Sequence, residues 1–106
     1  MNSKVKVTVR GTQFDTEVVG DPIGYFVVHR GVFDRKGKWV ATHPATGCAA
    51  VTAPTREVAE WAARRLSDLG VDFDEIDTIE KSKALDPSVL NEIYLITGAA
   101  RLGGMA

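Results

Sequence analysis

Three side chains in this 106-residue sequence have thiol or imidazole chemistry: His29, His43 and Cys48, its only two histidines and its single cysteine. A cysteine beside a histidine is the arrangement of a nucleophile activated by a general base. Such a pair also needs an orienting third group and an oxyanion site, and no pattern in the sequence supplies either. The spacing matches no metal motif. We therefore expect no enzymatic activity, no metal and no cofactor, and a small enzyme centred on His43 and Cys48 is the least favoured hypothesis.

A second group of side chains has the chemistry of nucleic-acid recognition. The stretch HRGVFDRKGKWVATH, residues 29–43, combines several cations with an indole ring around a turn. Ribbons of two or three strands can enter the major groove, where Arg reads guanine edges and Lys or Arg binds phosphates. The alternative is that the turn is an ordinary solvated loop. The candidate nucleic-acid-binding residues are Arg30, Arg35, Lys36, Lys38, Trp39 and His43.

The charge is distributed unevenly along the chain. Residues 1–65 contain ten Lys and Arg against six Asp and Glu, whereas residues 66–106 contain three against eight. The first part therefore has a net charge of +4 and permits an anionic partner, although the whole chain has a net charge of −1.

The acidic stretch DFDEIDTIE, residues 72–80, lacks the central glycine of a calcium loop. We expect it to be a solvated face, with two functional alternatives. It either docks a basic protein partner or competes with DNA for the basic face. The candidate partner-binding residues are Asp72, Asp74, Glu75 and Asp77.

Five antiparallel strands are expected to position these side chains. Alternating apolar and polar residues predict strands over 4–10, 13–19, 23–33, 38–43 and 48–53. A tight turn is expected at Gly11-Thr12 and a break at Gly20-Asp21-Pro22.

Two turns that end in glycine fix the predicted pairing of the last three strands. Gly37 and Gly47 are expected to take the left-handed conformation that other residues resist. The pairing that results sets Phe33 opposite Lys38, Val32 opposite Trp39, Arg30 opposite Ala41, and His43 opposite Cys48. One sheet face then gathers Val28, Arg30, Val32, Trp39, Ala41, His43, Cys48, Ala50 and Thr52. The other gathers Val27, His29, Gly31, Phe33, Val40, Thr42, Ala49, Val51 and Ala53.

Two helices are predicted after the strands. Thr55 is expected to cap the first, which ends at Gly70 and packs on the face with Val51 and Ala53, away from Arg30 and Trp39. Its apolar stripe is predicted to comprise Val58, Trp61, Ala62, Arg65, Leu66 and Leu69. Asp86 and Pro87 are expected to open the second helix, which stops by Gly98 and buries Val89, Leu90, Ile93 and Ile96. The alternative position for the second helix is over Trp39, which would then be a core residue.

These elements predict an α+β fold, with an antiparallel sheet of about five strands, a packed helix and a second C-terminal helix. The length predicts one domain over 1–106, with a core at 23–70, an acidic segment and helix at 71–98, and a tail at 99–106. With 44% hydrophobic residues, no membrane span and no signal peptide, we expect a cytoplasmic protein with no membrane partner. The oligomeric state is left open, and a dimer through strand 4–10 is permitted.

The segment RGVFDRKGKWVA, residues 30–41, resembles the opening of an AP2/ERF-type DNA-binding domain, in which an R-G-V strand leads through a turn to a G-K-W strand. The helix TREVAEWAARRL, residues 55–66, is also similar to the helix of that family, and integrase arm-binding domains share the plan. The resemblance covers about residues 30–69. It implies groove-facing roles for Arg30 and Trp39 and phosphate contacts for Arg35 and Lys38.

The leading hypothesis is therefore a small regulatory module of phage or mobile-element origin that binds double-stranded DNA with one sheet face. The alternative from a different class is a non-enzymatic protein-interaction domain, an inhibitor or adaptor. It would use the acidic segment or the apolar sheet face.

Overall fold

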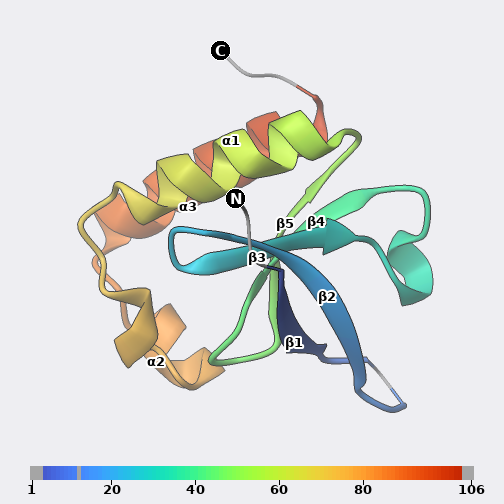
Figure 1. Ribbon diagram of the computed structural model, residues 1–106. Coiled ribbons are helices and arrows are strands. Elements are labelled where there is room, and N and C mark those ends of the chain that lie inside the picture. The colour runs from blue at the N-terminus through green and yellow to red at the C-terminus, as the bar shows by residue number, and fades with distance from the viewer. Residues whose placement is uncertain (1–3, 12, 104–106) are drawn as a thin grey trace.

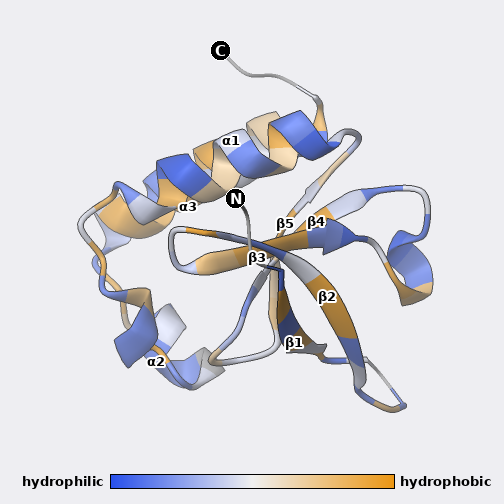
Figure 2. Ribbon diagram, viewed as in Figure 1, coloured by the Kyte–Doolittle hydropathy of each residue, from blue (hydrophilic) through white to orange (hydrophobic). Residues whose placement is uncertain are grey.

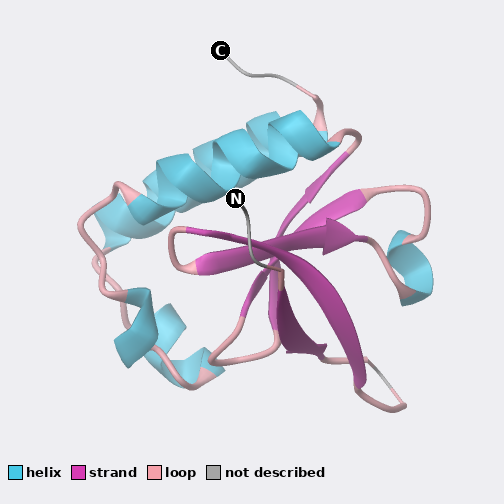
Figure 3. Cartoon of the chain, viewed as in Figure 1, coloured by secondary structure: helices cyan, strands magenta, loops and turns pink. Residues whose placement is uncertain are grey.

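The computed structural model describes residues 4–11 and 13–103 of the chain. Five antiparallel strands form one sheet in sequence order, and two long helices lie side by side over one of its faces (Figure 1). The predicted α+β class is confirmed (Figure 3). Thr12 of the predicted turn and residues 104–106 of the predicted tail lie outside the described residues. The strands are β1 (Val5–Val9), β2 (Thr16–Ile23), β3 (Phe26–Arg30), β4 (Trp39–His43) and β5 (Cys48–Ala53).

Strand β2 continues through Gly20-Asp21-Pro22, where the sequence predicted a break. Its first part pairs with β1, ending at Val5 opposite Gly20, and its last part pairs with β3, beginning at Asp21 opposite Val28. A Cβ on Gly20 would lie 2.4 Å from the Val28 carbonyl oxygen, so a side chain here would force the strands apart. The prediction was wrong because these three residues mark a change of pairing partner along one strand.

The connection between β2 and β3 is a tight hairpin that the sequence prediction missed. Ile23 pairs with Phe26, and Gly24 has a φ of 58°. The predicted strand over 23–33 is therefore two elements, because β3 starts after this turn and ends at Arg30.

The register between β3 and β4 differs from the prediction by two residues. Arg30 lies opposite Trp39, and Val28 lies opposite Ala41. The shift arises because residues 31–38 form a longer connection than expected, with a 3-10 turn at Phe33–Arg35. A shift of two residues leaves every side chain of β3 and β4 on its predicted face, because side chains alternate along a strand.

A bulge in β5 changes which side chains share a face. His43 lies opposite Cys48, as predicted, but Ala41 lies opposite Val51, which leaves Ala50 as an extra residue. Beyond Ala50 the alternation is reversed. Val51 and Ala53 therefore join Ala41 and Trp39 on one face, although the sequence placed them on opposite faces.

The helices are α1 (Arg56–Ser67), α2 (Ile79–Lys83) and α3 (Pro87–Arg101), with a second 3-10 turn at Phe73–Glu75. The Thr55 side chain accepts a hydrogen bond from the Val58 amide, and the Asp86 side chain accepts one from the Ser88 amide, so both predicted caps are confirmed. Helix α3 continues through Gly98, where an end was predicted, because its last turn is packed: Ala100 is fully buried.

The main core lies between the sheet and the two long helices. The buried stripe of α1 comprises Val58, Ala59, Ala62, Ala63 and Leu66, so Arg65 is exposed and Trp61 lies at the edge of the core. Residues after position 70 also belong to this core. They are Phe73, Ile76, Ile96 and Ala100. A second, smaller cluster of Val7, Val9 and Val27 lies on the other side of the sheet. The Arg10 amide donates to the Gly47 carbonyl at 2.9 Å, which brings the end of β1 to the β4–β5 turn.

Candidate functional site

Arg30 and Trp39 meet at the end of the sheet where β3 stops and β4 begins. The Arg30 guanidinium carbon lies 5.1 Å from the centre of the Trp39 ring, within the range of a cation–π contact. The Arg56 guanidinium of α1 lies 5.9 Å from the same ring. Trp39 is half-buried and packs against the main core, whereas Arg30 is exposed.

The expectation that the Trp39 face lies away from the first helix is wrong. Val28, Ala41, Val51 and Ala53 share this face, and all four are buried in the cluster that contains the apolar stripe of α1. The physical reason is the bulge at Ala50, which gathers apolar side chains on this face and leaves it in need of cover. The groove-facing roles that the resemblance implies for Arg30 and Trp39 require an open sheet face, and this face is covered.

Arg56 is held by acidic neighbours. Its Nη2 lies 2.5 Å from Oδ2 of Asp21, a side chain that is only 6% exposed, and its Nε lies 2.8 Å from Glu60. Lys4 binds the other oxygen of Asp21 at 3.1 Å. The hydrogen bond to Glu60 and the charge of Asp21 raise the pKa of Arg56 above its ordinary value. The charge of Arg56 is therefore balanced by Asp21 and Glu60, and its guanidinium packs against the Trp39 ring.

The turn over residues 31–38 is held in one conformation by several contacts. The Gly31 amide donates to the Lys38 carbonyl at 2.8 Å, and Gly37 has the predicted left-handed conformation, with a φ of 84°. Phe33 also has a positive φ, 58°, which is rare for a bulky residue and indicates that its surroundings fix it. Its ring packs edge-on against Phe14, with the ring centres 5.3 Å apart.

This turn carries the remaining predicted cations. Arg35 donates from Nε to the Thr52 hydroxyl at 3.1 Å and from Nη1 to Asp34 at 3.2 Å. Lys36 and Lys38 are exposed. In the part of the chain that the structure describes, Arg30, Lys36 and Lys38 have no carboxylate partner. We call the five residues Arg30, Arg35, Lys36, Lys38 and Trp39 the basic end.

His43, the sixth predicted nucleic-acid-binding residue, is not on this surface. It is buried, its Nε2 donates to the Phe73 carbonyl oxygen at 2.7 Å, and its Nδ1 is 3.0 Å from the Thr46 hydroxyl. Both ring nitrogens are therefore occupied, and the imidazole ties the β4–β5 hairpin to the 73–75 turn. Cys48 lies opposite His43, and its thiol contacts the Thr46 carbonyl oxygen at 3.8 Å. In this arrangement His43 has no free nitrogen with which to activate the thiol.

The acidic segment lies on the other side of the molecule from the basic end (Figure 1). Of its four candidate partner-binding residues, two have structural roles. Asp72 accepts a hydrogen bond from the Asp74 amide at 3.1 Å, and Asp77 pairs with Lys81 at 2.9 Å, which lowers the pKa of Asp77. Asp74 and Glu75 are exposed. The molecule thus has a cationic end and an anionic end, and in Figure 2 hydrophilic and hydrophobic residues alternate at both.

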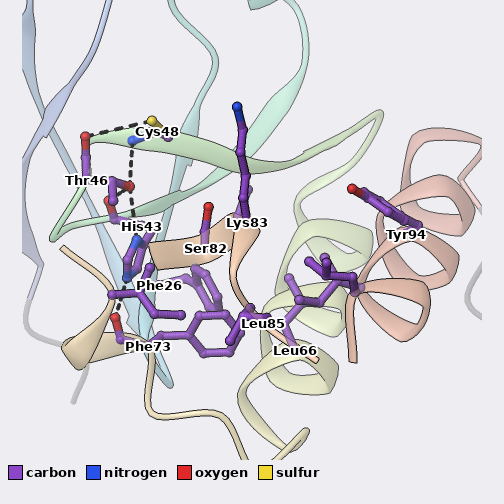
Figure 4. A pocket seen from close by; sticks show the side chains of 14 residues that line it. Phe26, His43, Thr46, Cys48, Leu66, Phe73, Ser82, Lys83, Leu85 and Tyr94 are labelled. Carbon is purple, nitrogen blue, oxygen red and sulfur yellow. Dashed lines mark hydrogen bonds between the residues drawn. The ribbon is translucent and has the colours of Figure 1, made fainter. Parts of the chain in front are cut away.

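A pocket that the sequence prediction did not identify opens between the sheet and the helices, with a volume of about 570 Å³. Figure 4 shows its floor, formed by Phe26, Leu66 and Phe73. Its lining residues come from parts of the chain that are far apart in sequence, between Phe26 and Tyr94, so no local pattern could reveal it. The other lining residues are His43, Thr46, Cys48, Ala50, Ile76, Ser82, Lys83, Leu85, Leu90, Ile93 and Tyr94.

Among the described residues, no group of three or more His, Cys, Asp or Glu side chains is placed to hold a metal ion. None of the described helices combines the length and the apolar character needed to cross a bilayer. No family model, curated protein or solved structure matches this chain.

Proposed function

We propose that the protein is a small DNA-binding module that contacts the phosphate backbone of duplex DNA with its basic end. The observation that carries the proposal is the grouping of Arg30, Lys36 and Lys38, exposed and unpaired with any described carboxylate, at the side of the molecule opposite its acidic segment. Such a separation of charge orients an approaching polyanion toward one end.

The contact between Arg30 and Trp39 supports a role in phosphate binding. A guanidinium that lies on an indole ring has fewer rotamers to lose when a ligand binds, and the N–H groups at its edge can donate two parallel hydrogen bonds to a phosphate. The Arg56 group on the same ring is already paired with Asp21 and Glu60. Arg30 is therefore the guanidinium at Trp39 that is available to a ligand.

The covered sheet face supports phosphate contact over base readout. Side chains of β4 and β5 that would enter a groove, such as Ala41 and Val51, are buried under α1. Phosphate contacts position a protein on DNA without reading sequence. The proposed module therefore binds duplexes with little sequence preference and with affinity that falls as salt rises. This differs from the groove insertion implied by the AP2/ERF resemblance.

Fluorescence anisotropy with a labelled duplex tests the proposal. The double variant Lys36→Ala, Lys38→Ala removes two exposed cations of the basic end and should weaken binding at low salt by about tenfold. The double variant Lys81→Ala, Lys83→Ala removes the same charge from α2 and should bind as the wild type does. An equal loss in both variants, or no binding by the wild type at low salt, would contradict the proposal.

A further inference from the structure

We infer that the pocket between β5, α1, α2 and α3 binds a small amphipathic molecule with an apolar body and one anionic head group. The inference does not depend on DNA binding, because the pocket and the basic end are separate. A volume of about 570 Å³ lies within the range typical of small-molecule sites, which is about 300–1,000 Å³.

The walls of the pocket select an apolar body. Two aromatic rings, Phe26 and Phe73, lie with their centres 5.1 Å apart at its floor. Aliphatic side chains, among them Leu66, Leu85, Leu90 and Ile93, extend the apolar surface. An acyl chain in this space would replace solvent against surfaces that hydrate poorly.

The exposure of two α3 side chains gives independent support. Leu90 and Ile93 have the spacing of a helix face that packs on a core, and the sequence predicts them to be buried. Both are only half-buried, and both line the pocket. Protein interiors are normally packed as densely as organic crystals. A bound apolar molecule would complete the burial that the sequence pattern specifies.

The charge at the pocket selects an anionic head group. Lys83 is the one Lys or Arg side chain among the described residues that line it, and none of those residues is Asp or Glu. The lining has no carboxylate although the adjacent segment is acidic. Phe73 and Ile76 of that segment are buried and line the pocket. Its side chains Asp74, Glu75 and Asp77 are exposed. Figure 4 shows the Lys83 side chain extending away from the apolar floor, where a carboxylate at the mouth would meet it.

Calorimetric titration with decanoate and with decan-1-ol tests the inference, since the two probes share a ten-carbon chain and differ in charge. We expect one site per chain. Lys83→Ala should weaken decanoate binding about two- to fivefold, the effect of an ion pair at an exposed rim, and leave decanol unchanged. Lys81→Ala, which removes the same charge from the same helix outside the pocket, should leave both unchanged.

A second pair of measurements locates the site. Ala50→Phe places a large ring in the pocket and should abolish binding of both probes. In wild-type protein, decanoate should shift the methyl resonances of Leu85, Leu90 and Ile93, a readout that needs no variant. The inference is overturned if decanoate binding is not saturable, if those methyl resonances do not move, or if decanol binds as tightly as decanoate.

Discussion

Arg30 and Trp39 lie directly opposite one another on β3 and β4, with the Arg30 guanidinium carbon 5.1 Å from the centre of the indole ring. The Arg56 guanidinium lies 5.9 Å from the centre of the same ring, and its charge is paired with Asp21 and Glu60. The Arg56 guanidinium is thus paired within the protein, whereas Arg30 has no carboxylate partner among the described residues. This division of roles leaves Arg30, next to Trp39, available to a ligand.

Arg30→Lys should separate charge from geometry at this position. The variant keeps the positive charge, but an ammonium on a flexible chain lacks the planar guanidinium that stacks flat on the indole ring and donates two parallel hydrogen bonds to one phosphate. We expect duplex affinity to fall about threefold, an effect on the scale of a partly exposed charged contact. Anisotropy titrations measure the change. Binding equal to that of the wild type would show that only the charge of Arg30 matters.

Arg56→Ala should destabilise the fold more than Asp21→Asn. Removal of Arg56 leaves the Asp21 carboxylate, which is 6% exposed, with Lys4 as its remaining ion-pair partner. Removal of the Asp21 charge instead leaves two cations that are 41% and 56% exposed and can be hydrated. The urea concentration at which half of the protein is unfolded, determined for each variant, measures the difference in stability. A larger loss of stability in Asp21→Asn than in Arg56→Ala would contradict this argument.

Several elements of the fold could be predicted from local patterns, but the β2–β3 hairpin, α2 and the assembly of the elements could not. Strand β5, both helix caps and the two left-handed glycines are where the sequence placed them. The bulge at Ala50 was not predicted, because Cys48–Ala53 is rich in small residues and its alternation is weak. That single extra residue decides which face the helices cover.

His29 should make the fold less stable in mild acid. It is buried, its Nδ1 donates to the Arg30 carbonyl oxygen at 2.8 Å, and its Nε2 accepts from the Thr42 hydroxyl at 2.6 Å. Burial lowers the pKa of His29, against a smaller opposing effect of the backbone hydrogen bond. The folded protein therefore binds the proton less readily than the unfolded chain, whose histidine titrates near 6.5.

It follows that the contribution of His29 to stability is complete above pH 6.5 and is lost as the pH falls from there toward the lower pKa of the folded state. Urea midpoints at pH 7.5 and pH 5.5 measure this loss. His29→Gln, which cannot take up a proton, should show a smaller difference between the two values. An equal acid effect in both proteins would assign it to other groups.

Two glycines should respond in opposite directions to the same substitution. Gly98 lies inside α3, and a Cβ there would meet no atom within 4 Å, so Gly98→Ala should stabilise the protein by about 0.5–1 kcal/mol. Gly20→Ala should cost more than about 1 kcal/mol, because its Cβ would lie 2.4 Å from a backbone oxygen of β3. The thermal unfolding midpoints of the two variants and of the wild type measure both changes in stability. A destabilised Gly98→Ala would mean that α3 packs against another surface on that side.

The candidate site could be predicted only in part. The sequence predicted Arg30, Arg35, Lys36 and Lys38 as candidate residues because these cations lie close together in the sequence, around the Gly37 turn. The burial of His43 was not predictable, since its partner, the Phe73 carbonyl, is 30 residues away and belongs to a segment without regular periodicity. The apolar pocket was missed for the same reason.

The salt dependence of duplex binding tests the central claim most directly. A plot of log Kd against log salt concentration gives a slope that counts the phosphates neutralised by the protein. The account predicts that Lys36→Ala, Lys38→Ala lowers this slope by about 2, and that Lys81→Ala, Lys83→Ala leaves it at the wild-type value. A wild-type affinity that does not depend on salt, or a slope lowered equally by both double variants, would contradict it.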